Sequence, residues 1–256
     1  PEAKLDEGFV TLATNDVYAF GALVLAYSLR DVNTSKKLIV LVTRDVGVVM
    51  RHLLSQVFDD IQQVTLLCGK DLLGCPERDR DNVRASFTKL HSWRMAGLSK
   101  GVFLDADTLA LANCDELFQR RELSAAPLRG WPDLFDTGVF VFKPSAKTYG
   151  LVMKHARDTA SFDGVDRGIL NDLFGKDWKA DLQLQLPFVY NVQVQIASPF
   201  FNKAYEHYCS PTAKIVHFWG SHKPWTQVFD WTTNLVHPKP ECPHLREHLQ
   251  KWWVSD

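Results

Sequence analysis

The sequence predicts an α/β protein with one domain, in which helices flank a mostly parallel central sheet. Two observations support this prediction. Strand-like runs such as residues 37–43 (KLIVLVT) are apolar along almost their whole length, which is typical of strands covered on both faces. These runs alternate with helix-like segments, and strand–helix–strand units with right-handed crossovers build parallel sheets. With 256 residues, 46% of them hydrophobic and 23% charged, residues 1–256 are expected to bury one core.

The first part of the chain supplies the clearest alternation. Residues 18–29 (YAFGALVLAYSL) carry enough Ala and Leu over a sufficient length to favour a helix, whereas the short β-rich run before them favours a strand. The elements expected in order are a strand at 9–14, a helix at 18–29, a strand at 37–43, a helix at 46–58 and a strand at 64–67.

Residues 69–86 interrupt this alternation with charge, glycine and proline. The pattern is typical of a solvated surface loop near the carboxyl edge of the sheet, and a contact with a partner is the alternative. The elements expected after this loop are a helix at 87–98, a strand at 102–105, a strand at 138–143, a helix after Pro144, a strand at 214–218 and an amphipathic helix at 244–253.

Composition argues against several classes of function. The formal net charge is −1 with nine histidines counted as neutral, so neither nucleic acid nor an anionic membrane is expected as a partner. Five cysteines without CxxC spacing argue against a zinc ribbon and a full disulfide framework, and favour a reducing cytoplasm. The N-terminal PEAKLDEG does not read as a leader, and no apolar run reaches the ~18 residues of a membrane span. The fingerprints GxGxxG, GxxxxGK(S/T) and GxSxG are missing, which removes the usual signals for a dinucleotide site, a P-loop and a nucleophile elbow.

Two carboxylates follow the apolar run VFL at residues 102–104. Asp105 then lies at the carboxyl end of a buried strand, where open α/β sheets collect ligands. If the backbone stays extended, Asp107 projects the same way, because side chains repeat with period two. Two hard oxygen donors close together suit Mg²⁺ or Mn²⁺, and these ions in turn suit substrate phosphates. The alternative is that Asp107 caps a helical turn.

The segment KIVHFWGSHKPW offers a third ligand. His217 lies at the end of another short strand, and Gly220 and Lys223 follow on a polar loop, so an imidazole and an ammonium can converge on a phosphate-bearing ligand. The alternative for His217 is a satisfied core residue beside Phe218 and Trp219. The alternative for Lys223 is a solvated charge.

These stretches together resemble a known family. The segments that carry the likeness are FVTLATNDVYAFGALVL, FTKLHSW, VFLDADTLALANCDELF, ELSAAP, GWPDLFDTGVFVFKPS, SFDGVDRGILN, LPFVYN and KIVHFWGSHKPW. From Phe9 to Trp253 the chain resembles glycogenin and its relatives in glycosyltransferase family 8, which are retaining enzymes with a metal-dependent nucleotide-sugar fold of the GT-A type. The resemblance implies one catalytic domain over 1–256 and a homodimer; the helix carrying Trp252 and Trp253 could instead simply cover the core.

The resemblance also implies a role for each matching residue. Asp105, Asp107 and His217 would hold Mn²⁺ across the diphosphate of a UDP-sugar. Donor binding would involve Leu12, Thr14, Asn15, Tyr18, Arg80, Ala106, Asp136, Thr137, Arg167, Gly220 and Lys223. Lys89, Asp163 and Asp166 would face the sugar as the catalytic group, with Asp166 stabilising an oxocarbenium-like centre or attacking it. The cation and Lys223 would stabilise charge on the departing UDP.

The chain departs from glycogenin at the acceptor. Glycogenin glucosylates its own tyrosine shortly after the LPFVYN segment, but here Phe200 or Phe201 takes that place, and a phenyl ring has no hydroxyl to modify. Tyr205 or Tyr208 can substitute only if the loop register shifts.

Three sugar-side positions differ as well. Asp136 stands where the family has an amide, and Arg167 stands where it has Gln. Leu128 replaces the Asp of the family segment SAAPDPG, which reads SAAPLRG in this chain. A carboxylate only accepts hydrogen bonds, so the pattern of sugar hydroxyls that is recognised should change. Asp136 and Arg167 are expected to pair with each other, although neutral drift would explain each change singly.

The missing tyrosine and the altered sugar pocket suggest an enzyme that modifies another molecule. In these features the chain is similar to the cytoplasmic protist α-galactosyltransferase that uses UDP-galactose to cap a glycan on the SCF ubiquitin-ligase adaptor subunit. The expected function is therefore transfer of an α-linked galactose to a terminal glucose of a cytoplasmic glycoprotein. A self-glucosylating glycogenin that uses UDP-glucose and a non-catalytic nucleotide-sugar-binding scaffold are the alternatives.

Overall fold

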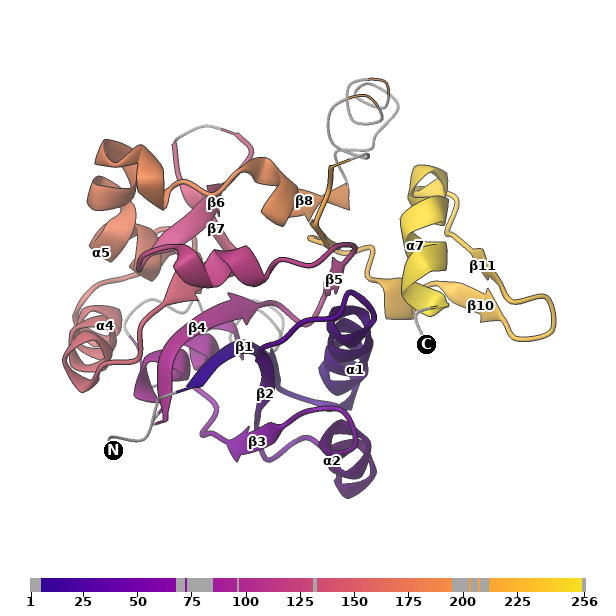
Figure 1. Cartoon of the computed structure of the whole chain (residues 1–256), viewed down its shortest axis with the longest axis horizontal. Helices are drawn as coiled ribbons and strands as arrows, with labels where there is room; N and C mark the ends of the chain where they lie inside the picture. Colours follow the sequence, from indigo (N-terminus) through magenta and orange to yellow (C-terminus); the bar gives the residue numbers. More distant parts are fainter. Residues whose placement is uncertain are drawn as a thin grey trace.

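The computed structural model describes residues 6–67, 72, 85–95, 97–130, 133–194, 203, 207 and 212–254. It confirms an α/β fold, with helices on both sides of a central sheet (Figure 1). The strands are β1 (Asp6–Ala13), β2 (Lys37–Val42), β3 (Asp60–Gln63), β4 (Leu98–Leu104), β5 (Thr108–Ala110), β6 (Ser124–Pro127), β7 (Phe135–Phe142), β8 (Val192–Gln193), β9 (Ile215–His217), β10 (Val228–Asp230) and β11 (Leu235–His237). The α-helices are α1 (Asp16–Asp31), α2 (Val48–Ser55), α4 (Ala146–Asp158), α5 (Asp166–Ala180) and α7 (Arg246–Trp253). Short 3-10 helices are η1 (Ser86–Arg94), η2 (Asp115–Gln119), η3 (Leu182–Leu184), η4 (Phe188–Tyr190), η7 (Pro224–Thr226) and η8 (Pro243–Leu245).

The main sheet has the strand order β3-β2-β1-β4-β7-β6. Strands β1 to β4 pair in parallel, as the alternation of strands and helices predicts. Strand β7 runs antiparallel to both of its neighbours, β4 and β6, so the sheet is mixed. The parallel strands therefore end at one edge, and the start of β7 lies there too.

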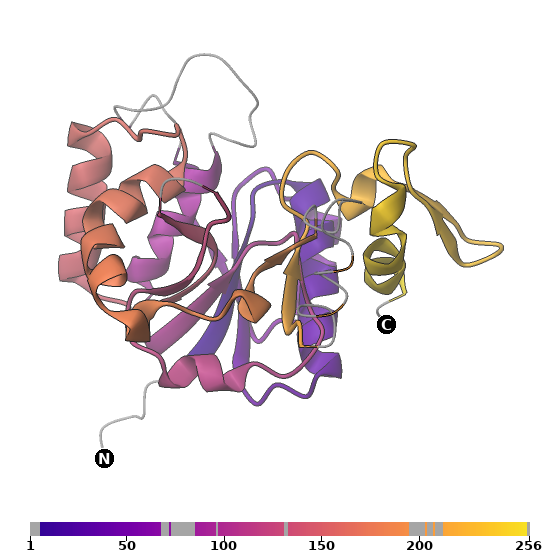
Figure 2. The ribbon, with the colours of Figure 1, turned by 90° about the horizontal axis from the view of Figure 1, so that it is seen from above.

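The period-two alternation of strand side chains divides the core into two layers. Phe9 of β1 packs with α1 on one face of the sheet, whereas its neighbour Val10 packs with α4, α5 and η1 on the other. In β4, Val102 and Phe103 divide in the same way. Figure 2 shows the two helical layers, with α1 on one side of the sheet and α4 and α5 on the other.

A second, three-stranded sheet lies beyond the carboxyl edge of β4. Its order is β5-β9-β8, with β9 antiparallel to β5 and parallel to β8. The register places Thr108 opposite His217. The ladder thus joins the segment after β4 to a strand more than a hundred residues later, and it fixes which side chains meet.

The C-terminal segment forms a β10–β11 hairpin and α7, which project from the body beyond α1 (Figure 1). Trp252 and Trp253 pack against Phe20 of α1, with ring centroids 5.2 and 5.8 Å apart from it. The helix therefore covers a hydrophobic cluster of the same chain, as one of the two interpretations expected. No helix in the described part of the chain is both long and apolar enough to cross a membrane.

Several expected elements are confirmed with shifted ends. The strand expected at 64–67 is wrong: the structure has β3 at Asp60–Gln63, and Val64 lies just beyond it. β3 is an edge strand, partly exposed, so its sequence DIQQ lacks the apolar run that identifies the inner strands. The helix expected at 87–98 is the 3-10 helix η1, and it ends at Arg94 before β4 begins. Most of the loop expected at 69–86 lies outside the described residues.

Candidate active site

A cavity of about 660 Å³ opens at the carboxyl ends of β1 and β4. Most of the residues expected in the site line it: Leu12, Thr14, Asn15, Tyr18, Lys89, Asp105, Ala106, Asp107, Asp136, Thr137, Asp166, Arg167, His217, Gly220 and Lys223. They come from segments spread over more than two hundred residues, and the sheet edges collect them at one place.

The two carboxylates lie on a tight turn between the sheets. Strand β4 ends at Leu104, and the Thr108 N–H donates to the Asp105 carbonyl at 3.0 Å before β5 begins. The expected extended backbone with period-two side chains is therefore wrong here, because the chain must turn to enter the second sheet. Asp107 does not cap a helix either, since β5 follows it directly.

The turn brings both carboxylates to His217. The His217 Nε2 lies 3.2 Å from Asp107 Oδ1 and 4.0 Å from Asp105 Oδ2. One ligand atom from each of the three residues can be chosen so that all lie within 4.8 Å of one another. Two carboxylate oxygens and one imidazole nitrogen are a donor set that fits a divalent cation such as Mn²⁺. The three residues could hold such an ion from one side and leave its other positions open to ligand oxygens.

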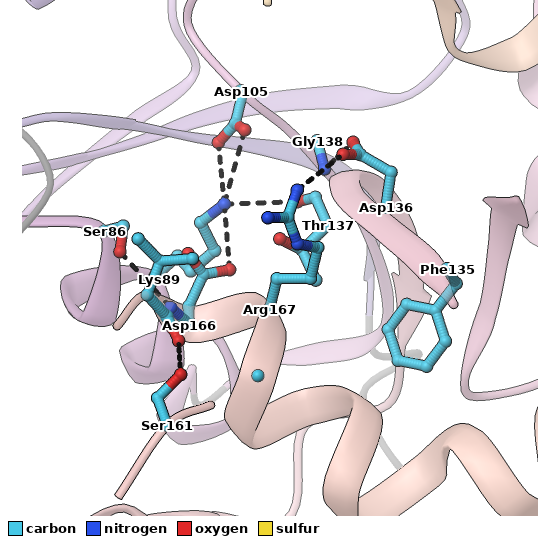
Figure 3. Close-up of polar contacts among 12 residues, drawn as sticks. Ser86, Lys89, Asp105, Phe135, Asp136, Thr137, Gly138, Ser161, Asp166 and Arg167 are labelled. Carbon is cyan, nitrogen blue, oxygen red and sulfur yellow. Dashed lines mark hydrogen bonds and ion pairs between the residues drawn. The ribbon is translucent and has the colours of Figure 1, made fainter. Parts of the chain in front are cut away.

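Two lysines neutralise the carboxylates. Lys89, on η1, lies 3.0 Å from Asp105 Oδ1 and 3.1 Å from Asp166 Oδ2, and donates to the Thr137 carbonyl at 3.2 Å (Figure 3). Lys223 pairs with Asp107 and donates to the Phe218 carbonyl at 2.8 Å. Each ammonium therefore lies beside the metal-ligand group, at a place where it can also meet an anionic ligand.

The burial of these charges shifts their pKa values. Burial lowers the pKa of Lys89, but its two carboxylate partners outweigh that effect and raise the pKa above its usual value. Burial raises the pKa of Asp107, but Lys223 and His217 hold it well below its usual range. Burial lowers the pKa of His217, and the Asp107 carboxylate outweighs it, so the net shift is upward. For Asp105, burial raises the pKa against the opposing effect of Lys89. Asp107 is thus the carboxylate most firmly held as an anion.

The first turn of α5 presents Asp166 and Arg167 to the cavity, and Asp163 lies in the loop before it. The Asp163 carboxylate accepts from the Gly168 N–H at 3.0 Å and from the Arg167 Nε at 2.8 Å. The Asp166 N–H donates to Ser86 Oγ at 3.3 Å, which ties the start of α5 to η1. Asp163 does not line the cavity, so its contacts are those of a residue that shapes the loop.

Arg167 connects the start of α5 to β7. Its Nη1 lies 3.8 Å from Asp136 Oδ2, which confirms the expected pairing of these two residues. In Figure 3 the two side chains point toward each other from α5 and β7. Part of the cavity wall is therefore built by an ion pair.

The turn from β1 into α1 forms another wall. Asn15 caps α1, because its Oδ1 accepts from the Tyr18 N–H at 3.0 Å. The Tyr18 ring packs edge-on against Trp225 at 5.3 Å between centroids. Gly21 lies beneath this contact, where an added Cβ would approach the Ala106 carbonyl and the Trp225 ring to 2.6 Å. The wall is thus aromatic and closely packed, which suits a flat heterocyclic ligand.

Comparison with known proteins places this geometry in a family. The sequence profile of glycosyl transferase family 8 matches residues 9–228. The chain belongs to glycosyltransferase family 8.

Alignments with curated relatives cover almost all of this chain. Human glycogenin-1 is 44% identical over 250 residues, which are 97% of this chain and 71% of that protein. Human glycogenin-2 is 44% identical over 253 residues, and the match spans 97% of this chain and 50% of glycogenin-2. The glycogenin of Neurospora crassa is 35% identical, with 98% of this chain and 35% of that protein covered. The chain therefore spans from about a third to about seven tenths of the length of these relatives.

Solved structures share the fold at low identity. GlyE from Streptococcus pneumoniae TIGR4 superposes with a TM-score of 0.67 at 18% identity, over 98% of this chain and 61% of that one. The galactosyltransferase LgtC, in complex with donor and acceptor sugar analogs, has a TM-score of 0.62 at 17% identity, over 97% and 95% of the two chains. Both are glycosyltransferases, and the likeness supports the GT-A fold predicted from the sequence.

Some residues expected in the site lie outside the described part of the chain, and the cavity contains others that were not expected. Arg80, Phe200, Phe201, Tyr205 and Tyr208 lie outside the described residues, and Leu128 is not part of the cavity lining. Among the residues that sequence reasoning missed are Ser86, Gly138, Trp219 and Trp225, which line the cavity, and Asn191, which contacts His217 behind it. The two tryptophans lie within the KIVHFWGSHKPW segment and Asn191 ends the LPFVYN segment, so these segments could have pointed to them. The contact of Asn191 with His217 could not be read from the sequence, because it crosses 26 positions.

Proposed function

We propose that this chain is a retaining, metal-dependent glycosyltransferase that uses a UDP-hexose. The observation that carries the proposal is the convergence of Asp105, Asp107 and His217 in a cavity beside Lys223. Three ligands of this kind can hold a divalent cation against a diphosphate, and Mn²⁺ is the ion we expect. The resemblance to glycogenin supports the same assignment.

Each part of the cavity then has a role in transfer. The bound cation would supply positive charge where the diphosphate leaves. Lys223 adds an ammonium on the same side, so that charge on the departing UDP is stabilised where it forms. The aromatic wall of Tyr18 and Trp225 would pack along the uridine. Asp166, held by Lys89, faces the sugar as the group that stabilises positive charge at the anomeric carbon or attacks it.

We further propose that the donor is UDP-galactose. The Asp136–Arg167 pair supports this, because a carboxylate and a guanidinium present different hydrogen-bonding groups from two neutral amides. An acceptor-only group beside a donor-only group should prefer a different arrangement of hexose hydroxyls. The proposed acceptor is a terminal glucose on the glycan of a cytoplasmic glycoprotein, by similarity to the protist α-galactosyltransferase that modifies the SCF adaptor.

A glycogenin-type glucosyltransferase that primes glycogen on itself is the second candidate. The glycogenins at 44% and 35% identity favour it over other reactions. The Phe200 and Phe201 positions oppose it, since self-glucosylation needs a hydroxyl. A non-catalytic scaffold is the third candidate, and the paired charges of Lys89 with Asp105 and Asp166 argue against it, because binding alone does not require them.

A donor screen tests the proposal. Release of UDP is measured for UDP-glucose and UDP-galactose with Mn²⁺, with Mg²⁺ and after chelation, and intact mass is recorded in parallel. We expect slow Mn²⁺-dependent release that is faster with UDP-galactose and leaves the protein mass unchanged. Steps of one hexose in the mass with UDP-glucose would instead establish the glycogenin-type reaction, and a preference for glucose would refute the galactose assignment.

The metal assignment has its own variant. Asp105→Asn should reduce Mn²⁺-dependent UDP release by about 10²-fold or more, because a metal ligand is lost. Asp158→Asn is the matched control: this carboxylate lies exposed on α4 and pairs with Lys154. Equal turnover of the Asp105 variant and the wild type would reject the metal site.

The remaining features of the proposal are assembly and place. We propose that residues 1–256 act as one catalytic domain, that two chains pair as a homodimer, and that the enzyme works in the cytoplasm. Size-exclusion chromatography with light scattering tests the dimer, and a monomer at all concentrations would contradict it.

A further inference from the structure

We propose that Asn191, held in one orientation by Asp136, positions the His217 imidazole so that its Nε2 is the atom offered to a divalent cation. This inference rests on the proposed metal-dependent function. Asn191 lies at the end of η4, behind His217 as seen from the cavity, and does not itself line the cavity.

Three buried side chains form a continuous hydrogen-bonded row. His217 Nδ1 lies 2.9 Å from Asn191 Oδ1, and Asn191 Nδ2 donates to Asp136 Oδ1 at 2.8 Å. The Gly138 N–H donates to the same Asp136 oxygen at 2.8 Å. Asn191 is 1% exposed, His217 2% and Asp136 3%, so water does not compete for these contacts.

The proton on His217 follows from these partners. Asp136 Oδ1 accepts from the Gly138 N–H and from the Asn191 NH₂ group, so the Asn191 oxygen is the atom directed toward His217. His217 Nδ1 then faces the Asn191 oxygen at 2.9 Å and an Asp136 oxygen at 3.6 Å, both of them acceptors. Nδ1 must therefore carry a proton. In the neutral ring, the lone pair is then on Nε2, the atom that faces Asp105 and Asp107.

Backbone packing holds the ring in the same position. A Cβ added to Gly138 would lie 2.3 Å from His217 Cε1 and 2.5 Å from Nδ1, so only glycine lets the imidazole lie there. On the other side, Val192 pairs with Val216 in the parallel β8–β9 ladder, which fixes Asn191 relative to β9. The Lys214 N–H donates to the Val189 carbonyl at 2.8 Å and ties the same two segments together. The backbone at Asn191 and at His217 therefore cannot shift without breaking this ladder.

The test measures metal binding directly. Mn²⁺ is titrated into the full chain with saturating UDP, and free Mn²⁺ is counted by electron paramagnetic resonance. Asn191→Leu removes both hydrogen bonds at similar volume, and we expect its Mn²⁺ affinity to be about 10- to 100-fold weaker. Asn191→Ala adds no bulk and repeats the test if the leucine variant does not fold. Melting temperatures show which variants are folded.

One further variant separates positioning from a general loss of structure. Gln193→Leu is the matched control, a buried amide on the adjoining β8 whose Nε2 has no hydrogen-bond partner among the described residues. It should leave Mn²⁺ affinity unchanged.

Each outcome decides the inference. Weaker binding in folded Asn191 variants, with Gln193→Leu near wild type, supports it. Wild-type affinity in folded Asn191 variants, or an equal loss in Gln193→Leu, overturns it and leaves the proposed function standing. No UDP-dependent Mn²⁺ binding by the wild-type chain would overturn the proposed function and this inference together.

Discussion

Removing the Lys89 ammonium is expected to destabilise the protein strongly, because the charge lies between two carboxylates in the core of the site. Lys89 is 4% exposed, and the Asp166 oxygen at 3.1 Å from it has no hydrogen-bond partner among the described residues. In Lys89→Met, Asp166 is left as an unpaired buried charge. Breaking a buried pair in this way costs about 3–5 kcal/mol. Asp105 adds less, since its side chain is 29% exposed and water can reach it.

The assay is thermal unfolding of the metal-free protein at neutral pH. At about 2–4 °C per kcal/mol for a chain of this size, the melting temperature should fall by roughly 6–20 °C. Adding Asp166→Asn to Lys89→Met removes the unpaired charge and should restore about half of the loss or more. Lys154→Met is the control, because Lys154 pairs with Asp158 on the surface and its loss costs ~0–1 kcal/mol. A shift of under ~2 °C for Lys89→Met, or a double variant no more stable than the single one, would refute the reasoning.

Two further predictions concern the site and the pH dependence of stability. Gly138→Ala places a Cβ 2.3 Å from His217 Cε1 and should displace the ring, so Mn²⁺ affinity with UDP should fall about tenfold or more; unchanged affinity would contradict the packing. Asp115 accepts hydrogen bonds from residues 34–35, and although burial alone raises its pKa, these bonds lower it below the usual value. A group whose pKa is lower in the folded state contributes stability at pH values above its unfolded-state pKa. This contribution is lost as the pH falls through its folded-state pKa. Asp115→Asn should therefore melt below the wild type at pH ~7, and the gap should narrow as the pH falls towards ~3; an equal gap at both values would show that the charge is not responsible.

The inner strands could be predicted because they are covered on both faces. Residues 38–42 of β2 and 102–104 of β4 are buried, and each of these stretches reads as an apolar run. β3 could not be placed, because it is an edge strand whose polar sequence DIQQ gives no periodic signal. The short strand β9 could be predicted from its apolar run at 214–218, whereas β5 and β8 have three and two residues and are defined by their pairing with β9. Local sequence does not contain that information.

The metal-ligand group could be predicted for a related reason. Asp105 directly follows an apolar run and His217 ends another. The ends of strands are where a sheet gathers polar side chains. The turn that brings Asp107 to them could not be foreseen, because the chain changes sheet there. Asn191 ends the LPFVYN segment that carries the family likeness, but its contact with Asp136 could not be foreseen, because the two residues lie 55 positions apart.

The aromatic wall of the cavity has a practical consequence for spectroscopy. Trp219 and Trp225 line the cavity, and Trp225 lies against Tyr18. A nucleobase that stacks nearby would quench their emission, whereas Trp93 and Trp178 are buried on the other side of the sheet and should be less affected. Intrinsic fluorescence can thus report occupancy of the site without a label, and Trp225→Phe would show how much of the signal comes from that wall.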